Sequence, residues 1–128
     1  MSKNILNICQ VSLNNNIPLI IENYENFKKI YKKIKIYIIC PQTQVSEFRN
    51  KLNSEDIEII NEDKIISFKE FSKINDNLSI NINYQNQFKE RLDWYYQQIL
   101  KISFAINFIK KNKENLVIWD ADTIILEK

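Results

Sequence analysis

Short apolar runs alternate with amphipathic helical patterns along most of this chain. Strand-like runs occupy residues 5–11, 34–40, 57–60 and 116–119. Apolar side chains recur at three-to-four spacing between them, at residues 18–31, 46–52, 67–74 and 91–111. A strand, helix, strand, helix order predicts an α/β fold with a mainly parallel sheet and helices on both faces. The length of 128 residues fits one domain, spanning residues 1–128.

Local signals refine this expectation. Pro18 fits the first turn of a helix, and we expect Ser46 and Ser67 to begin the two short helices. Residues 75–86 are polar and rich in asparagine, and predict a loop that could hold an edge strand. The pattern at 91–111 is apolar on almost every side, which predicts a largely buried helix.

The chain contains no glycine and no histidine. It therefore has none of the glycine-rich phosphate loops of dinucleotide-binding proteins, P-loop NTPases and kinases. Catalytic Ser-His-Asp and Cys-His relays and histidine zinc sites are excluded as well. Any chemistry must use carboxylates, lysines, amides, hydroxyls or a metal held by oxygen. We expect asparagine to take glycine's place in turns and helix caps.

Charge and cysteine usage narrow the class of protein. The net charge is +2, which predicts no nucleic-acid partner, and the lysine pairs at 28–29, 32–33 and 110–111 are interpreted as solvated helix faces. Cys9 and Cys40 lie in apolar runs and are expected to be buried free thiols of a reducing compartment. The chain has neither a transmembrane stretch nor a signal peptide, so we expect a cytoplasmic protein.

Two carboxylates follow the last apolar run. Asp120 and Asp122 are separated by the small Ala121, and alternate residues of an extended backbone point to the same side. The carboxyl end of a buried strand is where α/β sheets bind ligands. Paired carboxylates there suit a hard cation, Mn²⁺ or Mg²⁺, which keeps positions open for substrate phosphates. A solvated turn after a strand explains the bare motif equally well.

The helix before this strand carries a polar patch. Gln97 and Gln98 lie one turn before Lys101, so both amides neighbour its ammonium group. A lysine in so apolar a helix must reach water, an acid or a ligand phosphate. We predict that this patch faces the aspartate pair, with Arg91 as a second cation near Trp94.

The pattern R-x-x-W-Y-x-Q-Q-x-x-K, followed by four apolar residues and D-A-D-T, resembles a family of bacterial glycosyltransferases with the GT-A fold. It comprises Arg91, Trp94, Tyr95, Gln97, Gln98 and Lys101, then residues 116–119 and Asp120 to Thr123. The resemblance is clear over residues 91–126 and looser elsewhere. Two departures are Asp93, where relatives have glycine, and the first strand-to-helix region, which lacks their proline and acidic residue.

The resemblance implies a Rossmann-like half-domain that binds a nucleotide-diphospho-sugar, such as a UDP- or GDP-sugar. Asp120 and Asp122 would hold Mn²⁺ or Mg²⁺, and Asp120 would also contact the donor. Arg91, Trp94, Gln97, Gln98 and Lys101 would bind the donor, with Lys101 near phosphate. The residues from Val11 to Asn15 would lie near the base. The acceptor would be a glycan or another group, as in surface polysaccharide synthesis, and peripheral membrane contact stays open.

Other interpretations remain. A GT-A domain is about twice this length, so we expect the chain to be the N-terminal, donor-binding part, without the acceptor half. Such a part could instead be a non-catalytic domain that binds a partner. A phosphatase of the haloacid-dehalogenase type also places D-x-D after an apolar strand, but Thr123 and Ile124 fit its motif poorly.

Overall fold

The computed structural model describes residues 5–78 and 91–120, with four strands and four helices of more than one turn. The strands are β1 (Ile5–Val11), β2 (Lys33–Cys40), β3 (Ile57–Asn61) and β4 (Val117–Ile118). The helices are α1 (Ile17–Ile30), α2 (Val45–Lys51), α3 (Phe68–Leu78) and α5 (Leu92–Asn112). Short 3-10 turns precede α1, α2 and α3, at Asn14–Asn16, Gln42–Gln44 and Glu62–Lys64. The predicted alternation of strands and helices is confirmed.

All four strands are parallel and lie in the order β3-β2-β1-β4. β1 and β2 pair along seven residues from Ile5–Lys33 to Val11–Ile39, and they form the centre of the sheet. β4 pairs with the other edge of β1 through Ile8–Val117 and Cys9–Ile118. The chain thus builds outward from β1 through β2 to β3, and then returns to the opposite side of β1. This is a Rossmann-like arrangement.

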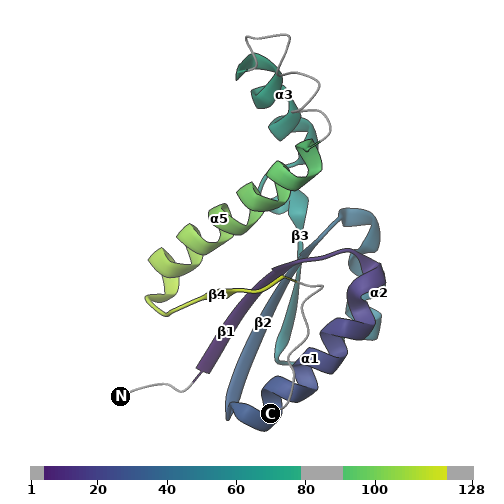
Figure 1. Ribbon diagram of the computed structural model, residues 1–128, viewed down its shortest axis with the longest axis vertical. Helices are drawn as coiled ribbons and strands as arrows, with labels where there is room; N and C mark the ends of the chain where they lie inside the picture. The colour runs from purple at the N-terminus through teal and green to yellow at the C-terminus, as the bar shows by residue number, and fades with distance from the viewer. Residues whose placement is uncertain (1–4, 79–90, 121–128) are drawn as a thin grey trace.

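Helices cover both faces of the sheet, as the alternating pattern predicts (Figure 1). One apolar cluster joins alternate strand residues such as Ile8, Ile36 and Ile38 to α1 and α2. The second cluster joins the opposite-facing Cys9 and Ile39 to α3 and α5. Successive strand residues thereby serve different layers, because their side chains alternate across the sheet.

Two local predictions need correction, and a third is confirmed. Ser46 does not begin α2, because the backbone is already helical from the preceding 3-10 turn and the helix starts at Val45. Residues 75–78 belong to α3 rather than to a loop, since Leu78 continues the helical spacing of Phe71 and Ile74; residues 79–86 lie outside the described residues. Ser67 does cap α3, because its Oγ accepts a hydrogen bond from the Glu70 amide at 3.2 Å.

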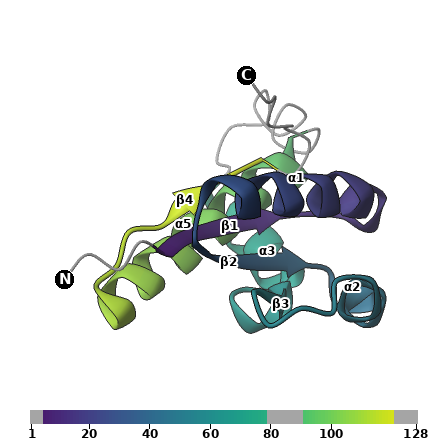
Figure 2. The same ribbon diagram turned by 90° about the horizontal axis from the view of Figure 1, so that it is seen from below.

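Helix α5 is not largely buried. Tyr96, Leu100 and Phe108 face the protein interior, whereas Ile102 and Ile106 are about half exposed on the opposite side. The sheet covers one face of the helix, and among the described residues no second layer lies over the other. Figure 1 shows α5 and α1 on opposite sides of the sheet, and Figure 2 shows α5 crossing behind β1.

The prediction that asparagine takes glycine's place holds for a turn but not for the left-handed helix cap. Among the described residues, the one with positive φ is Lys113, at φ 54° and ψ 33°, directly after α5. Its amide donates to the Ile109 carbonyl at 3.0 Å, which closes the last turn. A lysine rather than an asparagine therefore occupies this left-handed cap, although asparagines do form the 3-10 turn at Asn14–Asn16.

Candidate functional site

The strand order creates a topological switch point between β1 and β4. The connection after β1 leads to β2 on one side, while β4 lies on the other, so the loops after the two strands diverge. Ligands of open α/β sheets bind in the crevice at such a point, outside the carboxyl ends of the strands. Ser12 follows β1 directly, and Asp120 follows β4 after one intervening residue.

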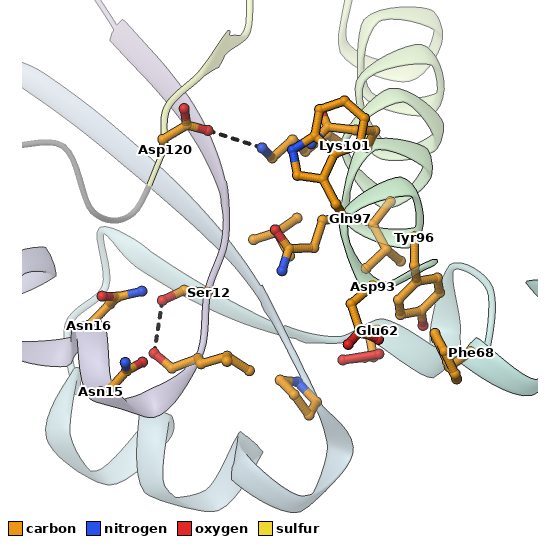
Figure 3. Close-up of a pocket in the computed structure, with 16 residues that line it drawn as sticks. Ser12, Asn15, Asn16, Glu62, Phe68, Asp93, Tyr96, Gln97, Lys101 and Asp120 are labelled. Carbon is orange, nitrogen blue, oxygen red and sulfur yellow. Dashed lines mark hydrogen bonds and ion pairs between the residues drawn. The ribbon is translucent and has the colours of Figure 1, made fainter. Parts of the chain in front are cut away.

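A cavity of about 940 Å³ lies at this carboxyl edge. Its walls come from the loop after β1, the ends of β2 and β3, the start of α3, the first three turns of α5 and the end of β4. The lining residues are Val11, Ser12, Leu13, Asn15, Asn16, Pro41, Glu62, Phe68, Asp93, Trp94, Tyr96, Gln97, Gln98, Leu100, Lys101 and Asp120. Figure 3 shows Gln97 between the loop after β1 and the Lys101–Asp120 pair.

Lys101 and Asp120 meet across the cavity. The Lys101 Nζ donates to Asp120 Oδ1 at 3.0 Å (Figure 3). The lysine side chain is 11% exposed, whereas the aspartate side chain is 65% exposed. Of the three partners expected for this lysine, the structure therefore shows an acid. The pair connects the middle of α5 to the end of β4, and the open carboxylate remains accessible from the cavity.

The loop after β1 is held by short polar contacts. Its Asn14 amide donates to Gln44 Oε1 at 2.8 Å, and Asn14 Nδ2 donates to Glu47 Oε1 at 3.0 Å. The Ser12 amide donates to the Ile39 carbonyl at 2.9 Å. These bonds fasten the loop to α2 and β2, so that Asn15 and Asn16 border the cavity from a fixed position.

The other end of the cavity is acidic and aromatic. Figure 3 shows Glu62 and Asp93 near each other there, with Tyr96 beside them. Burial raises the pKa of Glu62, the nearby Tyr96 hydroxyl opposes this shift, and the charges of Asp63 and Asp93 add to it. The Tyr96 hydroxyl also lies 2.6 Å from the Ile66 carbonyl, to which it donates. Burial and the neighbouring Glu62 raise the pKa of Tyr96, so it stays a neutral donor.

The charges that line the cavity do not balance. Glu62, Asp93 and Asp120 are carboxylates, and Lys101 is the one cation among the described lining residues. When all are ionised, the lining carries a formal charge of about −2. Such a cavity attracts cations and repels a bare phosphate. No group of three or more metal-ligating side chains occurs within residues 5–78 and 91–120.

The predicted site residues are largely brought together. Trp94, Gln97, Gln98, Lys101 and Asp120 all line the cavity. Arg91 is not among the lining residues; it lies exposed before the first turn of α5. Asp122 lies outside the described residues.

A model described as a family of unknown function, DUF6492, matches residues 14–128. The chain belongs to the DUF6492 family. No curated protein and no solved structure matches it. The match includes Lys101, Asp120 and every lining residue after Leu13, so the cavity of this DUF6492 chain falls mostly within the family region.

Sequence reasoning missed the acidic end of the cavity. Glu62 follows β3 at the same edge as Asp120, and this position after a strand was the available signal. The rings of Phe68 and Tyr96 are in contact, with centroids 5.2 Å apart, and no short motif marks such a pair.

Within the described residues of this DUF6492 chain, no helix is long and apolar enough to cross a membrane.

Proposed function

We propose that this DUF6492 chain binds a nucleotide-diphospho-sugar at the carboxyl-edge cavity and belongs to a metal-dependent glycosyltransferase of GT-A type. The observation that carries the proposal is the placement of Lys101 and Asp120, 3.0 Å apart, at the switch point between β1 and β4. This is the position at which α/β sheets bind phosphorylated ligands. The two glutamines that resemble the family pattern line the same cavity.

The charge of the cavity supports a metal requirement. A diphosphate is an anion, and a lining with three carboxylates and one lysine would repel it. Mn²⁺ or Mg²⁺ accepts oxygen ligands and binds phosphates at its open positions. Asp120 fits such a role because its carboxylate is 65% exposed and uses one oxygen for Lys101. Asp122 would be the second ligand by sequence.

Different residues of the cavity would bind different parts of the donor. Lys101, already held near Asp120, would neutralise a phosphate oxygen. Gln97 and Gln98 would donate hydrogen bonds to donor hydroxyls, and the half-exposed Trp94 would pack against a ring at the rim. The loop containing Asn15 and Asn16 would border the base. When bound, the metal would act as a Lewis acid on the departing diphosphate.

The acceptor would be a glycan or another hydroxyl-bearing group. We place the activity in the cytoplasm because Cys9 and Cys40 are both buried and free, as expected in a reducing compartment.

Calorimetry with UDP and GDP, each with and without Mn²⁺, tests the proposal. We expect one nucleotide to bind in the presence of metal and Asp122→Ala to remove this binding. Asp93→Asn serves as the matched control, because it removes a carboxylate from the same cavity but far from Asp120. Undiminished binding by the Asp122→Ala variant would rule out the metal role. Failure of a folded wild-type chain to bind either nucleotide would favour a non-catalytic, partner-binding domain.

A further inference from the structure

The fold places lysines that are far apart in the sequence at the same edge of the sheet. α1 ends at Ile30 and β2 begins at Lys33, so Lys32 and Lys33 lie at the amino edge of the sheet. α5 ends at Asn112, at the same edge, with Lys110 and Lys111 in its last turn. Figure 2 shows the end of α5 beside the start of β1. A hydrogen bond of 3.0 Å from Asn7 Nδ2 to Glu114 Oε2 fixes the residues after α5 to β1.

A second cavity lies at this amino edge, between the end of α1 and the end of α5. It has a volume of about 520 Å³, and its lysines, Lys28, Lys32, Lys33 and Lys35, all come from the end of α1, the turn after it and β2. Asn112 and Glu114 line it from the end of α5, whereas Lys110 and Lys111 lie in the last turn of that helix and do not line the cavity. Two carboxylates line it, and both are engaged: Asp56 accepts from the Tyr24 hydroxyl at 2.6 Å, and Glu114 accepts from Asn7. These neutral donors leave both carboxylates charged, but four lysines line the cavity, so its lining carries a formal charge of about +2, in contrast to the acidic cavity at the opposite edge.

Large apolar side chains lie exposed among these lysines. Ile30 is 61% exposed and Tyr31 is 42% exposed, between Lys28 and Lys32. Ile109 is 51% exposed, directly before Lys110. Neither water nor a polyanion such as nucleic acid offers isoleucine side chains an apolar surface against which to be buried. They are, however, the side chains that enter the boundary between lipid headgroups and acyl chains.

We propose that the amino edge, formed by the C-terminal ends of α1 and α5, docks on an anionic phospholipid bilayer. Lysines near such a surface are attracted by its negative potential, and the neighbouring isoleucines insert into the interface. A second copy of the chain is a poorer occupant, because it would bring like-charged lysines together. Docking in this way leaves the carboxyl-edge cavity at the far side of the sheet, open to water. This inference does not depend on the proposed function.

Co-sedimentation of the full chain with vesicles tests the proposal. We expect binding to vesicles that contain phosphatidylglycerol, little binding to pure phosphatidylcholine, and loss of binding at about 1 M salt, where screening is nearly complete. Lys32→Glu with Lys110→Glu should weaken binding by about 30-fold or more, since each basic residue near the surface contributes about fivefold.

Lys64→Glu with Lys69→Glu is the matched control. It changes the net charge by the same amount, but these lysines lie after β3 and in α3, away from the amino edge. The control should bind vesicles within about threefold of wild type. Equal weakening by both pairs would mean that net charge alone attracts the chain, and would overturn a defined docking edge.

The apolar component is tested separately. Ile30→Ser and Ile109→Ser should each weaken vesicle binding by about tenfold without lowering the melting temperature, because both side chains are exposed. Ile102→Ser, at a similar exposure but about two turns earlier in α5 and so farther from the amino edge, should have little effect. Equal loss with Ile102→Ser, or vesicle binding unchanged in all three variants, would overturn the proposal. So would tighter binding to duplex DNA than to anionic vesicles, or concentration-dependent dimerisation that the isoleucine variants abolish.

Discussion

The two edges of one parallel sheet differ in charge, shape and burial. At the carboxyl edge, three carboxylates and a buried lysine line a cavity of about 940 Å³. At the amino edge, lysines from α1 and β2 line a smaller cavity, and the last turns of α1 and α5 carry further lysines beside exposed isoleucines. The net charge of +2 conceals this separation, because it averages the two edges. In a parallel sheet, residues that come after strands lie at one edge and residues that come before strands lie at the other, so each edge can have its own charge.

The cause lies in the connections. Every strand of a parallel sheet ends at the same edge, so the residues after β1, β3 and β4 lie together there. Ser12 and Asp120 share this edge although they are 108 positions apart in the sequence. The residues that precede strands and end helices meet at the other edge. Helix C-termini favour lysine because of the helix dipole, and both α1 and α5 carry two lysines in their last turn. A basic edge therefore follows from ordinary helix capping.

Alkaline pH should produce the largest effect on stability, through the thiols buried toward the carboxyl ends of β1 and β2. Burial raises the pKa of Cys9 to about 12 and that of Cys40 to about 11. An unfolded thiol ionises near pH 8.5–9, so the folded state holds protons that the unfolded state has lost. The stabilising contribution is complete below about pH 8.5 and is lost as the pH rises toward the folded values. Each thiol should remove about 1.4 kcal/mol per pH unit.

Urea unfolding between about pH 8 and pH 10 measures this loss. The variant with Cys9→Ala and Cys40→Ala should be less stable at neutral pH and should show a clearly flatter pH dependence. An unchanged slope in that variant would contradict the assignment to the thiols.

Replacing a lysine by methionine at each edge should affect nucleotide binding at the carboxyl edge only. Lys101→Met should weaken metal-dependent nucleotide binding by roughly 30-fold, since a hydrogen bond to a charged group contributes about 2 kcal/mol. Lys32→Met, at the amino edge, should leave nucleotide binding unchanged. Calorimetry on both variants checks the prediction, and equal effects would show that the two edges do not differ in function.

The left-handed cap at the amino edge should be improvable. Lys113→Gly should stabilise the chain by about 1 kcal/mol, because glycine adopts φ 54° without the cost of a Cβ atom. Lys111→Gly, inside the last turn of α5, should destabilise it by about the same amount. Thermal unfolding of the two variants should move the midpoint in opposite directions. Shifts of the same sign would mean that loss of charge outweighs the backbone effect.

Asp120→Asn should have the smallest effect on stability. The ion pair with Lys101 has one exposed partner, and such pairs contribute about 0–1 kcal/mol. Urea unfolding should therefore place this variant within about 1 kcal/mol of wild type. A larger loss would mean that the pair holds α5 against β4, so that the site is a structural clamp.

Much of this fold follows from local sequence. Apolar residues mark the strand at Ile5–Val11, isoleucines mark the strand at Lys33–Cys40, and Ser67 marks the start of α3. The sequence predicts that Lys101 contacts water, an acid or a ligand phosphate, because a buried ammonium group needs a polar or charged partner to offset its lost hydration. These signals act over a few residues, and their outcome does not depend on distant contacts.

What could not be predicted depends on packing between distant segments. The exposure of Ile102 follows from how much of α5 the sheet covers, which no local periodicity determines. The position of Lys32 and Lys110 at the same edge of the sheet depends on the strand order, and so does the place of Glu62 in the cavity. The helical cap at Lys113 runs against residue preference, because closure of α5 outweighs the cost of its positive φ.

Paramagnetic broadening by Mn²⁺ tests the central claim most directly, because it reports where the metal binds. In an ¹⁵N-labelled chain with UDP or GDP present, we predict that low concentrations of Mn²⁺ broaden the amide signals of Ser12, Lys101 and Asp120. The signals of Tyr31, Lys33 and Asn112 at the amino edge should stay sharp. Broadening centred on the amino edge, or none at the carboxyl edge in the folded chain, would contradict the assignment of a metal-dependent nucleotide site to this cavity.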